Sequence, residues 1–140
     1  MVDKYKLVEF DKNNKSLIEI LKKYSKINCR NELDTGYISA SLAKTDVGFY
    51  FYNNDKPLAF ICVQVMRKER LHITLICSVQ NTDKLGSRLL NIISEYAQRE
   101  KYKSITLECD NKLEKFYKKF GFFVAKRHEM EFIDMVKKFE

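Results

Sequence analysis

The sequence has 140 residues, 45% of them hydrophobic, which is enough for one domain with a buried core and too little for two. We therefore expect a single domain over residues 1–140. No stretch approaches the ~18 consecutive apolar residues of a membrane span, and Met1-Val2-Asp3-Lys4 lacks the apolar core of a signal peptide. We expect a soluble, cytoplasmic protein without a membrane partner.

The net charge of +7 predicts a surface that attracts anions, such as a phosphorylated small molecule or a nucleic acid. The lysines are scattered along the chain rather than clustered with aromatic residues, which argues against nucleic acid. The four cysteines are widely spaced, without a CxxC pair or a histidine at metal-ligand spacing. We therefore predict no metal site and no disulfide scaffold, with the cysteines reduced.

The first third of the chain predicts a strand and two helices. Alternation over Tyr5 to Phe10 indicates a strand. Ser16 stands at an N-cap position before a run of leucine and isoleucine, which indicates a helix that ends near Lys26. A second short helix is expected within Leu33 to Ala43.

The middle of the chain predicts three antiparallel strands. Aromatic and β-branched residues fill 48–52, 58–66 and 71–77, and short polar segments separate these runs. The first separator contains Asn53, Asn54 and Pro57, which are turn-forming residues. We expect a meander of three strands.

A helix follows this meander and leads to a parallel strand. Leu89, Leu90, Ile93 and Ala97 are spaced for one face of a helix. Residues 104–109 then form another strand, so strand, helix and strand make a crossover.

The last part of the chain predicts a short helix and a further strand. Asp110 or Asn111 can cap the helix, and Gly121 stands at the position that ends it. Residues 122–132 supply a final strand and room for one more short element. Together these elements indicate a mixed α/β domain.

The loop before the crossover helix has the composition of an anion site. A helix N-terminus presents N–H groups and a positive dipole end, so Asn81 to Ser87 can cradle a phosphate. Gly86 lets the backbone approach an anion, and Lys84 and Arg88 add positive charge. On this segment alone, an ordinary capped helix is the preferred interpretation.

The segment Phe116-Tyr117-Lys118-Lys119-Phe120-Gly121-Phe122 closely resembles the end of the acetyltransferase core in the GNAT superfamily of N-acetyltransferases. The loop at Gly86 is also similar to that family's pyrophosphate loop, although Asn81 and Lys84 replace its usual residues. The resemblance implies a central, mostly antiparallel sheet of six to seven strands, a parallel pair splayed at the cofactor site, and about four helices. It also implies an acyltransferase with acetyl-coenzyme A as acetyl donor.

The resemblance assigns two sets of residues to the reaction. Tyr117 would be the general acid for the departing thiolate, since a phenol and an alkyl thiol have similar proton affinities. The cofactor would contact three short stretches: Leu75, Ile76 and Cys77; Thr82, Asp83, Lys84, Leu85, Gly86, Ser87 and Arg88; Asn111 and Phe116.

An amine must be neutral to attack a thioester, so the acceptor site needs a base. Glu108 is the first candidate, because it is a charged residue at the end of an otherwise apolar strand, and it would also bind the amine. His72 is the second candidate for the acceptor site. His128 lies in the polar stretch Lys126 to Glu129 and is interpreted as a solvated strand residue.

The acceptor is less well defined by the sequence. Leu107-Glu108-Cys109 followed by the Phe116 to Phe122 segment is most similar to eukaryotic-type glucosamine-6-phosphate N-acetyltransferases, and the net charge of +7 favours a phosphorylated amine. A protein or peptide amine is the second expectation, and a degenerate, non-catalytic binding module stays open as a third. Many relatives pair through their C-terminal strands, which leaves a homodimer open.

Overall fold

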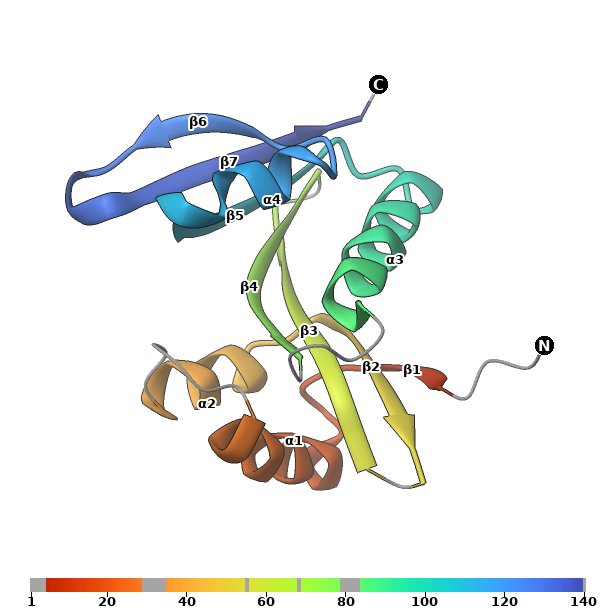
Figure 1. Cartoon of the computed structure of the whole chain (residues 1–140). Helices are drawn as coiled ribbons and strands as arrows, with labels where there is room; N and C mark the ends of the chain where they lie inside the picture. The colour runs from red at the N-terminus through yellow and green to blue at the C-terminus, as the bar shows by residue number, and fades with distance from the viewer. Residues whose placement is uncertain (1–4, 29–34, 55, 68, 79–83, 140) are drawn as a thin grey trace.

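The computed structural model describes residues 5–28, 35–54, 56–67, 69–78 and 84–139. Strands and helices alternate along this part of the chain, and two one-turn 3-10 helices, η1 and η2, stand among them (Figure 1). In chain order the elements are β1 (Lys6–Phe10), α1 (Lys15–Asn28), α2 (Thr35–Ala43), β2 (Val47–Asn53), β3 (Lys56–Met66), β4 (Arg70–Ser78), α3 (Leu85–Arg99), β5 (Ser104–Asp110), η1 (Asn111–Leu113), α4 (Glu114–Lys118), β6 (Phe123–Arg127), η2 (Glu129–Glu131) and β7 (Phe132–Lys138).

The strands form one sheet in the order β1-β2-β3-β4-β5-β7-β6. Strands β1 to β4 are a meander of antiparallel neighbours, and β6 pairs antiparallel with β7, which in turn pairs antiparallel with β5. Only β4 and β5 run parallel among the described strands, because α3 crosses over between them. The predicted mixed α/β fold, with up to seven strands and one parallel pair, is confirmed.

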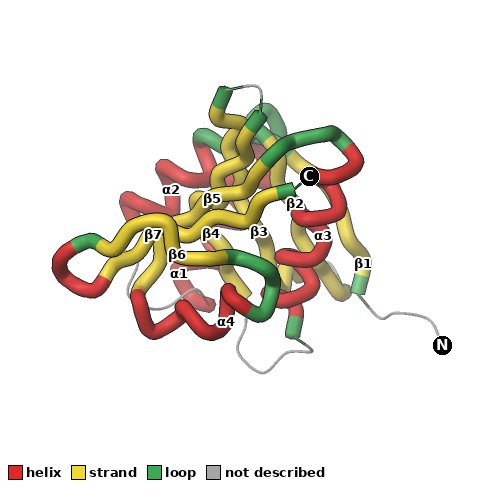
Figure 2. The backbone as a smooth tube through the Cα atoms, turned by 90° about the horizontal axis from the view of Figure 1, so that it is seen from above, coloured by secondary structure: helices red, strands yellow, loops and turns green. Residues whose placement is uncertain are grey.

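Helices cover both faces of the sheet (Figure 2). Helix α3 buries five apolar residues at helical spacing against one face: Leu85, Leu89, Leu90, Ile93 and Ala97. Helices α1 and α2 cover the other face, where residues such as Leu21 and Leu42 pack on Phe60 and Leu75. Each fully buried leucine or isoleucine contributes roughly 1.5–3 kcal/mol, so these two clusters hold the layers together.

The parallel pair opens along its length. Strands β4 and β5 are hydrogen-bonded from Arg70 and Ser104 only as far as Ile73 and Leu107. Beyond that point β4 continues beside β3 to Ser78, and β5 continues beside β7 to Asp110. The two strands therefore diverge and leave a gap in the middle of the sheet.

A β-bulge in β4 marks the point of divergence. Val63 of β3 pairs with Ile73, and the β3 residue before it, Cys62, pairs with Leu75. Thr74 is therefore an extra residue in β4. Bulges bend a strand and change the direction of its side chains. Here Ile73 packs toward the cluster under α3 and Leu75 toward the cluster under α1 and α2.

Most element boundaries agree with the sequence, and two do not. Helix α1 is capped by Asn14, whose side chain accepts a hydrogen bond from the Leu17 N–H at 3.3 Å, so the predicted cap at Ser16 is wrong. The strand and the short element expected within 122–132 are β6 and η2, and a further strand that the sequence did not indicate, β7, follows over Phe132–Lys138. Gly121 has a φ of 91°, as a glycine that ends a helix requires.

The cysteines follow the prediction only in part. Cys62 and Cys109 are free and buried, and burial raises the pKa of Cys62 to about 12. Cys77 is disulfide-bonded, so the expectation that all the cysteines are reduced is wrong there. Within the described residues no helix combines the length and the apolar character needed to cross a membrane.

Candidate active site

A cavity of about 420 Å³ lies where β4 and β5 diverge. Its walls come from α2, the second half of β4, the end of β5, the η1 and α4 segment, and the start of β7. The lining residues are Tyr37, Ile73, Thr74, Leu75, Ile76, Leu107, Glu108, Cys109, Asp110, Leu113, Tyr117 and Phe132. The gap in the sheet thus forms a site of the size that binds small molecules.

Glu108 stands on one side of this cavity. Its neighbours in β5, Leu107 and Cys109, are buried toward α3 and α4, so the alternation of the strand turns Glu108 to the opposite face, where it is exposed. Tyr37 of α2 lies across from it and donates a hydrogen bond to the Thr74 carbonyl at 2.6 Å. Burial raises the pKa of Tyr37, and the charge of Glu108 adds to that rise.

Tyr117 stands on another wall, on α4. Its ring packs edge to face against Phe116, with centroids 5.1 Å apart, and against Phe122, with centroids 5.8 Å apart. Burial raises the pKa of Tyr117 well above its usual value, and the nearby Cys109 thiol adds to that rise. The phenol therefore keeps its proton throughout the neutral range and can donate it in a hydrogen bond.

The N-terminus of α3 lies beside the end of β4. The Arg88 N–H donates to the Lys84 carbonyl at 3.0 Å, so Leu85, Gly86 and Ser87 precede that helical bond. A Cβ at Gly86 would lie 3.4 Å from the Ser78 Oγ, which places this helix end beside β4. Such an end is suited to bind a phosphate.

The residues predicted for the cofactor are distributed around these features. Leu75 and Ile76 line the cavity, whereas Cys77 is buried in the cluster under α1 and α2. Thr82 and Asp83 lie outside the described residues. Lys84, Leu85, Gly86 and Ser87 form the start of α3.

Three other predicted contacts lie at the edges of the site. The Arg88 guanidinium lies over the Phe51 ring, 4.6 Å from its centroid, on the side of β2. Asn111 is exposed at the start of η1, and Phe116 is half-buried and packs on Phe120. None of these three residues lines the cavity. Asp110 and Leu113, which lie close to Asn111 in the sequence, do line it.

His72 lies on the same sheet face as Glu108 but outside the cavity lining. Its Nδ1 is 2.7 Å from the Thr106 Oγ1, and its ring is half-buried. Burial lowers the pKa of His72, and the positive charge of Arg70 lowers it further. This imidazole is a poorer proton acceptor than a solvent-exposed histidine.

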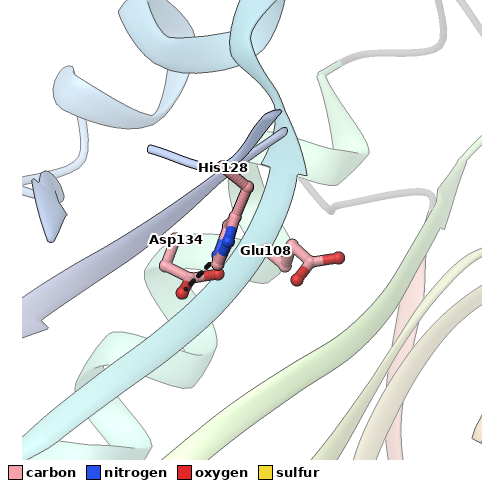
Figure 3. Close-up of side chains that lie close together, drawn as sticks. All are labelled: Glu108, His128 and Asp134. Carbon is pink, nitrogen blue, oxygen red and sulfur yellow. Dashed lines mark hydrogen bonds and ion pairs between the residues drawn. The ribbon is translucent and has the colours of Figure 1, made fainter. Parts of the chain in front are cut away.

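The structure brings two further titratable residues to Glu108 that the sequence did not indicate. Asp134 of β7 is its direct partner across the strands, and His128 precedes η2. The His128 Nε2 lies 2.8 Å from the Asp134 Oδ2, and Figure 3 shows the three side chains gathered where β5 and β7 run side by side. The β5–β7 pairing was the missing information, because these residues are distant in sequence.

Comparison with known proteins identifies the family. The acetyltransferase (GNAT) domain model matches residues 20–139. No curated protein matches the sequence.

Among solved structures, the ribosomal-protein-S18-alanine N-acetyltransferase of Escherichia coli is similar with a TM-score of 0.78 at 14% identity, over 96% of this chain and 93% of that one. Ard1 of Thermoplasma volcanium has a TM-score of 0.75 at 15% identity, over 99% of each chain. The aminoglycoside 6'-N-acetyltransferase of Enterococcus faecium has a TM-score of 0.74 at 15% identity, over 95% of this chain and 96% of that one.

At these identities the solved structures show a shared fold, and the family model covers most of the chain. The divergent parallel pair, the cavity beside it and the helix end at Gly86 agree with that assignment. The chain belongs to the GNAT acetyltransferase family, whose members are acyltransferases that use acetyl-coenzyme A as donor.

Proposed function

We propose that this chain transfers an acetyl group to a primary amine that is bound beside Glu108. The observation that supports this most directly is the placement of a base and an acid on two walls of one cavity. Glu108 lies on β5 and Tyr117 on α4, and both line the 420 Å³ space between the diverging strands. A non-catalytic binding module would not need this pair.

The chain's own groups fit the donor. Bound acetyl-coenzyme A supplies the acetyl group as a thioester. Past Ile73 the β4 strand has no β5 partner, so its backbone is available to an extended ligand rich in amides. The first N–H groups of α3, next to Ser78, offer a place for a diphosphate, and Lys84 stands at that helix end.

The acid and base have separate tasks. Glu108 holds the ammonium group of the acceptor and takes its proton, which leaves a neutral, nucleophilic amine. Tyr117 keeps a proton on its phenol oxygen because burial disfavours the phenolate, so it can donate a hydrogen bond to the sulfur that leaves. The same rise in pKa makes complete transfer of the proton less favourable than from a phenol in water.

Two acceptor classes follow from different observations. An aminosugar phosphate such as glucosamine 6-phosphate is supported by the sequence resemblance at Glu108 and by the net charge of +7. A peptide or protein amine is supported by the cavity lining, where the charged residues are Glu108 and Asp110, both acidic. Exposed apolar side chains complete that wall: Tyr37, Leu113 and Phe132.

A panel of amines decides between the two classes. Release of free thiol from acetyl-coenzyme A is measured with glucosamine 6-phosphate, with glucosamine, and with a peptide that has a free N-terminus, against the same peptide already acetylated. Faster turnover of the peptide removes the aminosugar phosphate as acceptor. Absence of turnover with every amine, while the cofactor still binds, contradicts the enzymatic function.

A cytoplasmic location and a homodimer stay predictions at this point. Cell fractionation tests the location, and light scattering of the purified protein tests the oligomeric state.

A further inference from the structure

Glu108 is one of three titratable side chains that meet beside the cavity. A carboxylate oxygen of Glu108, one of Asp134 and a ring nitrogen of His128 all lie within 4.8 Å of one another. Figure 3 shows the three side chains. Glu108 lines the cavity, whereas the other two extend from it along the sheet face toward solvent. The cluster therefore connects the acceptor site to the outside.

The β6–β7 hairpin holds His128 in this position. Its backbone N–H donates to the Phe132 carbonyl at 2.9 Å, and its Nε2 is 2.8 Å from Asp134. Because a carboxylate only accepts hydrogen bonds, the Nε2–H of His128 is the donor to Asp134. The lone pair of Nδ1 is then free to accept a proton.

Charged and titratable groups of β4, β5, β6, β7 and α2 lie in or around this cluster. Glu108 and Asp134 are directly opposite in the β5–β7 ladder, where like charges repel. Lys126 of β6 is the other ladder partner of Asp134. His72 of β4 and Tyr37 of α2 complete the surroundings, since the charges of both carboxylates act on the pKa of His72 and that of Glu108 acts on the pKa of Tyr37.

A carboxylate alone is a poor final acceptor for the proton of an alkylammonium group. The carboxylic acid that forms is a much stronger acid than the ammonium ion, so the proton tends to return. Imidazolium is a weaker acid than a carboxylic acid, so transfer from protonated Glu108 to an imidazole is downhill. His72 is less suited to this task, because burial lowers its pKa.

We propose that His128, held by Asp134, takes over the proton that Glu108 removes from the acceptor amine and releases it to solvent. This inference rests on the proposed function. The proton moves from the ammonium nitrogen to a carboxylate oxygen of Glu108, then through one bridging water to the Nδ1 of His128, and then to bulk water, while the Nε2–H stays on Asp134. Glu108 is a carboxylate again after each transfer, and His128 acts only through it.

The first test is the pH profile of the variant His128→Gln with an amine that the parent acetylates. Glutamine can still donate to Asp134 but cannot take up the proton. We expect kcat to fall about tenfold near pH 7.5, less than the ~10²–10⁴ for a group that itself contacts the substrate. The difference should shrink below about pH 6, where an imidazole is already protonated, and KM for acetyl-coenzyme A should stay the same.

Two controls separate proton transfer from structure. Glu129→Gln changes an exposed neighbour in η2 and should leave the pH profile unchanged. The kcat of His128→Ala should be low and should increase when free imidazole is added. All assays contain a chelator, so that no metal ion occupies Glu108, His128 and Asp134. A pH profile of His128→Gln that matches the parent profile, or a failure of imidazole to restore His128→Ala, overturns the proposal.

A second measurement does not depend on activity. The chain has two histidines, so the His128 ring signal can be assigned by NMR with a His72→Gln variant. We expect the ring signals to report the proton on Nε2, and the Nδ1 signal to change in Glu108→Gln, where a neighbouring negative charge has gone. An unchanged Nδ1 signal overturns the relay. An inactive protein with the expected NMR shift contradicts the proposed function instead.

Discussion

Tyr117 illustrates how position changes the chemistry of a single residue. In water a phenol begins to lose its proton near pH ~10. Here Phe116 and Phe122 enclose the ring, and burial raises its pKa, so the hydroxyl stays protonated at every pH at which the protein would work. The same enclosure holds the ring in one orientation toward the cavity.

Tyr117→Phe should lower kcat by about a hundredfold, because general acid catalysis typically contributes ~10²–10⁴ and only the hydroxyl is lost. The affinity for coenzyme A should change little, since the ring and its packing remain. Steady-state kinetics and calorimetric titration of coenzyme A test this. An unchanged kcat would show that another group protonates the thiolate.

Lys84 is a second residue whose conformation is informative. It is the N-cap of α3 with φ 54° and ψ 41°, the left-handed conformation that glycine adopts without cost. The GNAT resemblance predicts glycine at this position, and the structure retains the glycine-like backbone with a lysine in it. The lysine places a positive charge at the helix end that we propose to bind the diphosphate.

Lys84→Gly should therefore raise the free energy of unfolding by about 1 kcal/mol, the approximate cost of one left-handed residue with a side chain. Urea denaturation measures this, with Lys84→Ala as the matched control. Alanine removes the same charge but keeps the Cβ, so it should give no gain. Equal stabilisation by both substitutions would refute the strain. Both variants should bind coenzyme A more weakly than the parent.

At the scale of elements, α4 is a helix of five residues that must be held in place from outside. Arg127 of β6 donates two hydrogen bonds to Glu114 at the start of α4, at 3.0 and 3.2 Å, and Lys118 adds an ion pair at 2.7 Å. The hydrogen bond from Arg127, with that from Lys118, lowers the pKa of Glu114 to about 2. These bonds tie α4, and with it Tyr117, to the sheet.

Glu114→Gln should lower the melting temperature at pH 7, where the ion pairs are intact. Because the pKa of Glu114 is lower in the folded state than its usual 4.5, its stabilising effect is present above pH 4.5 and is lost as pH falls toward about 2. The difference between parent and variant should shrink over that range. Thermal melts as a function of pH measure it, with Glu95→Gln on α3 as control. A difference that is constant with pH would contradict the ion-pair explanation.

At the scale of the whole molecule, the net charge of +7 favours an anionic ligand at the start of α3. A ligand that binds only the folded state stabilises it by ~2.7 kcal/mol at 100 times its Kd, which is several degrees for a domain of this size. The charge also predicts that added salt weakens this binding.

Coenzyme A should therefore raise the melting temperature by several degrees at saturation, and the increase should fall at high salt. Pantetheine, which lacks the diphosphate, is the matched control and should give a smaller and salt-independent shift. Differential scanning fluorimetry measures both. An equal shift with pantetheine would show that the helix end at Gly86 does not hold a diphosphate.

The sequence by itself determined the order of elements as far as Phe122, the crossover and the resemblance at Phe116 to Phe122, because periodicity, turn residues and a local motif are all short-range signals. Those signals were sufficient to select Glu108 and Tyr117 as candidates, and the structure places both residues in the lining of one cavity. They were insufficient at Ser16, where the true cap lies two residues earlier at Asn14.

Only the tertiary structure decided which distant residues share the site. Tyr37 reaches the cavity from α2, Phe132 from β7, and His128 reaches Glu108 because β7 inserts between β5 and β6. Strand order depends on pairings across the whole chain, and no local pattern in Lys126 to Glu129 reports them. The same reason explains why His128 resembled a solvated strand residue in the sequence and stands beside the candidate base in the fold.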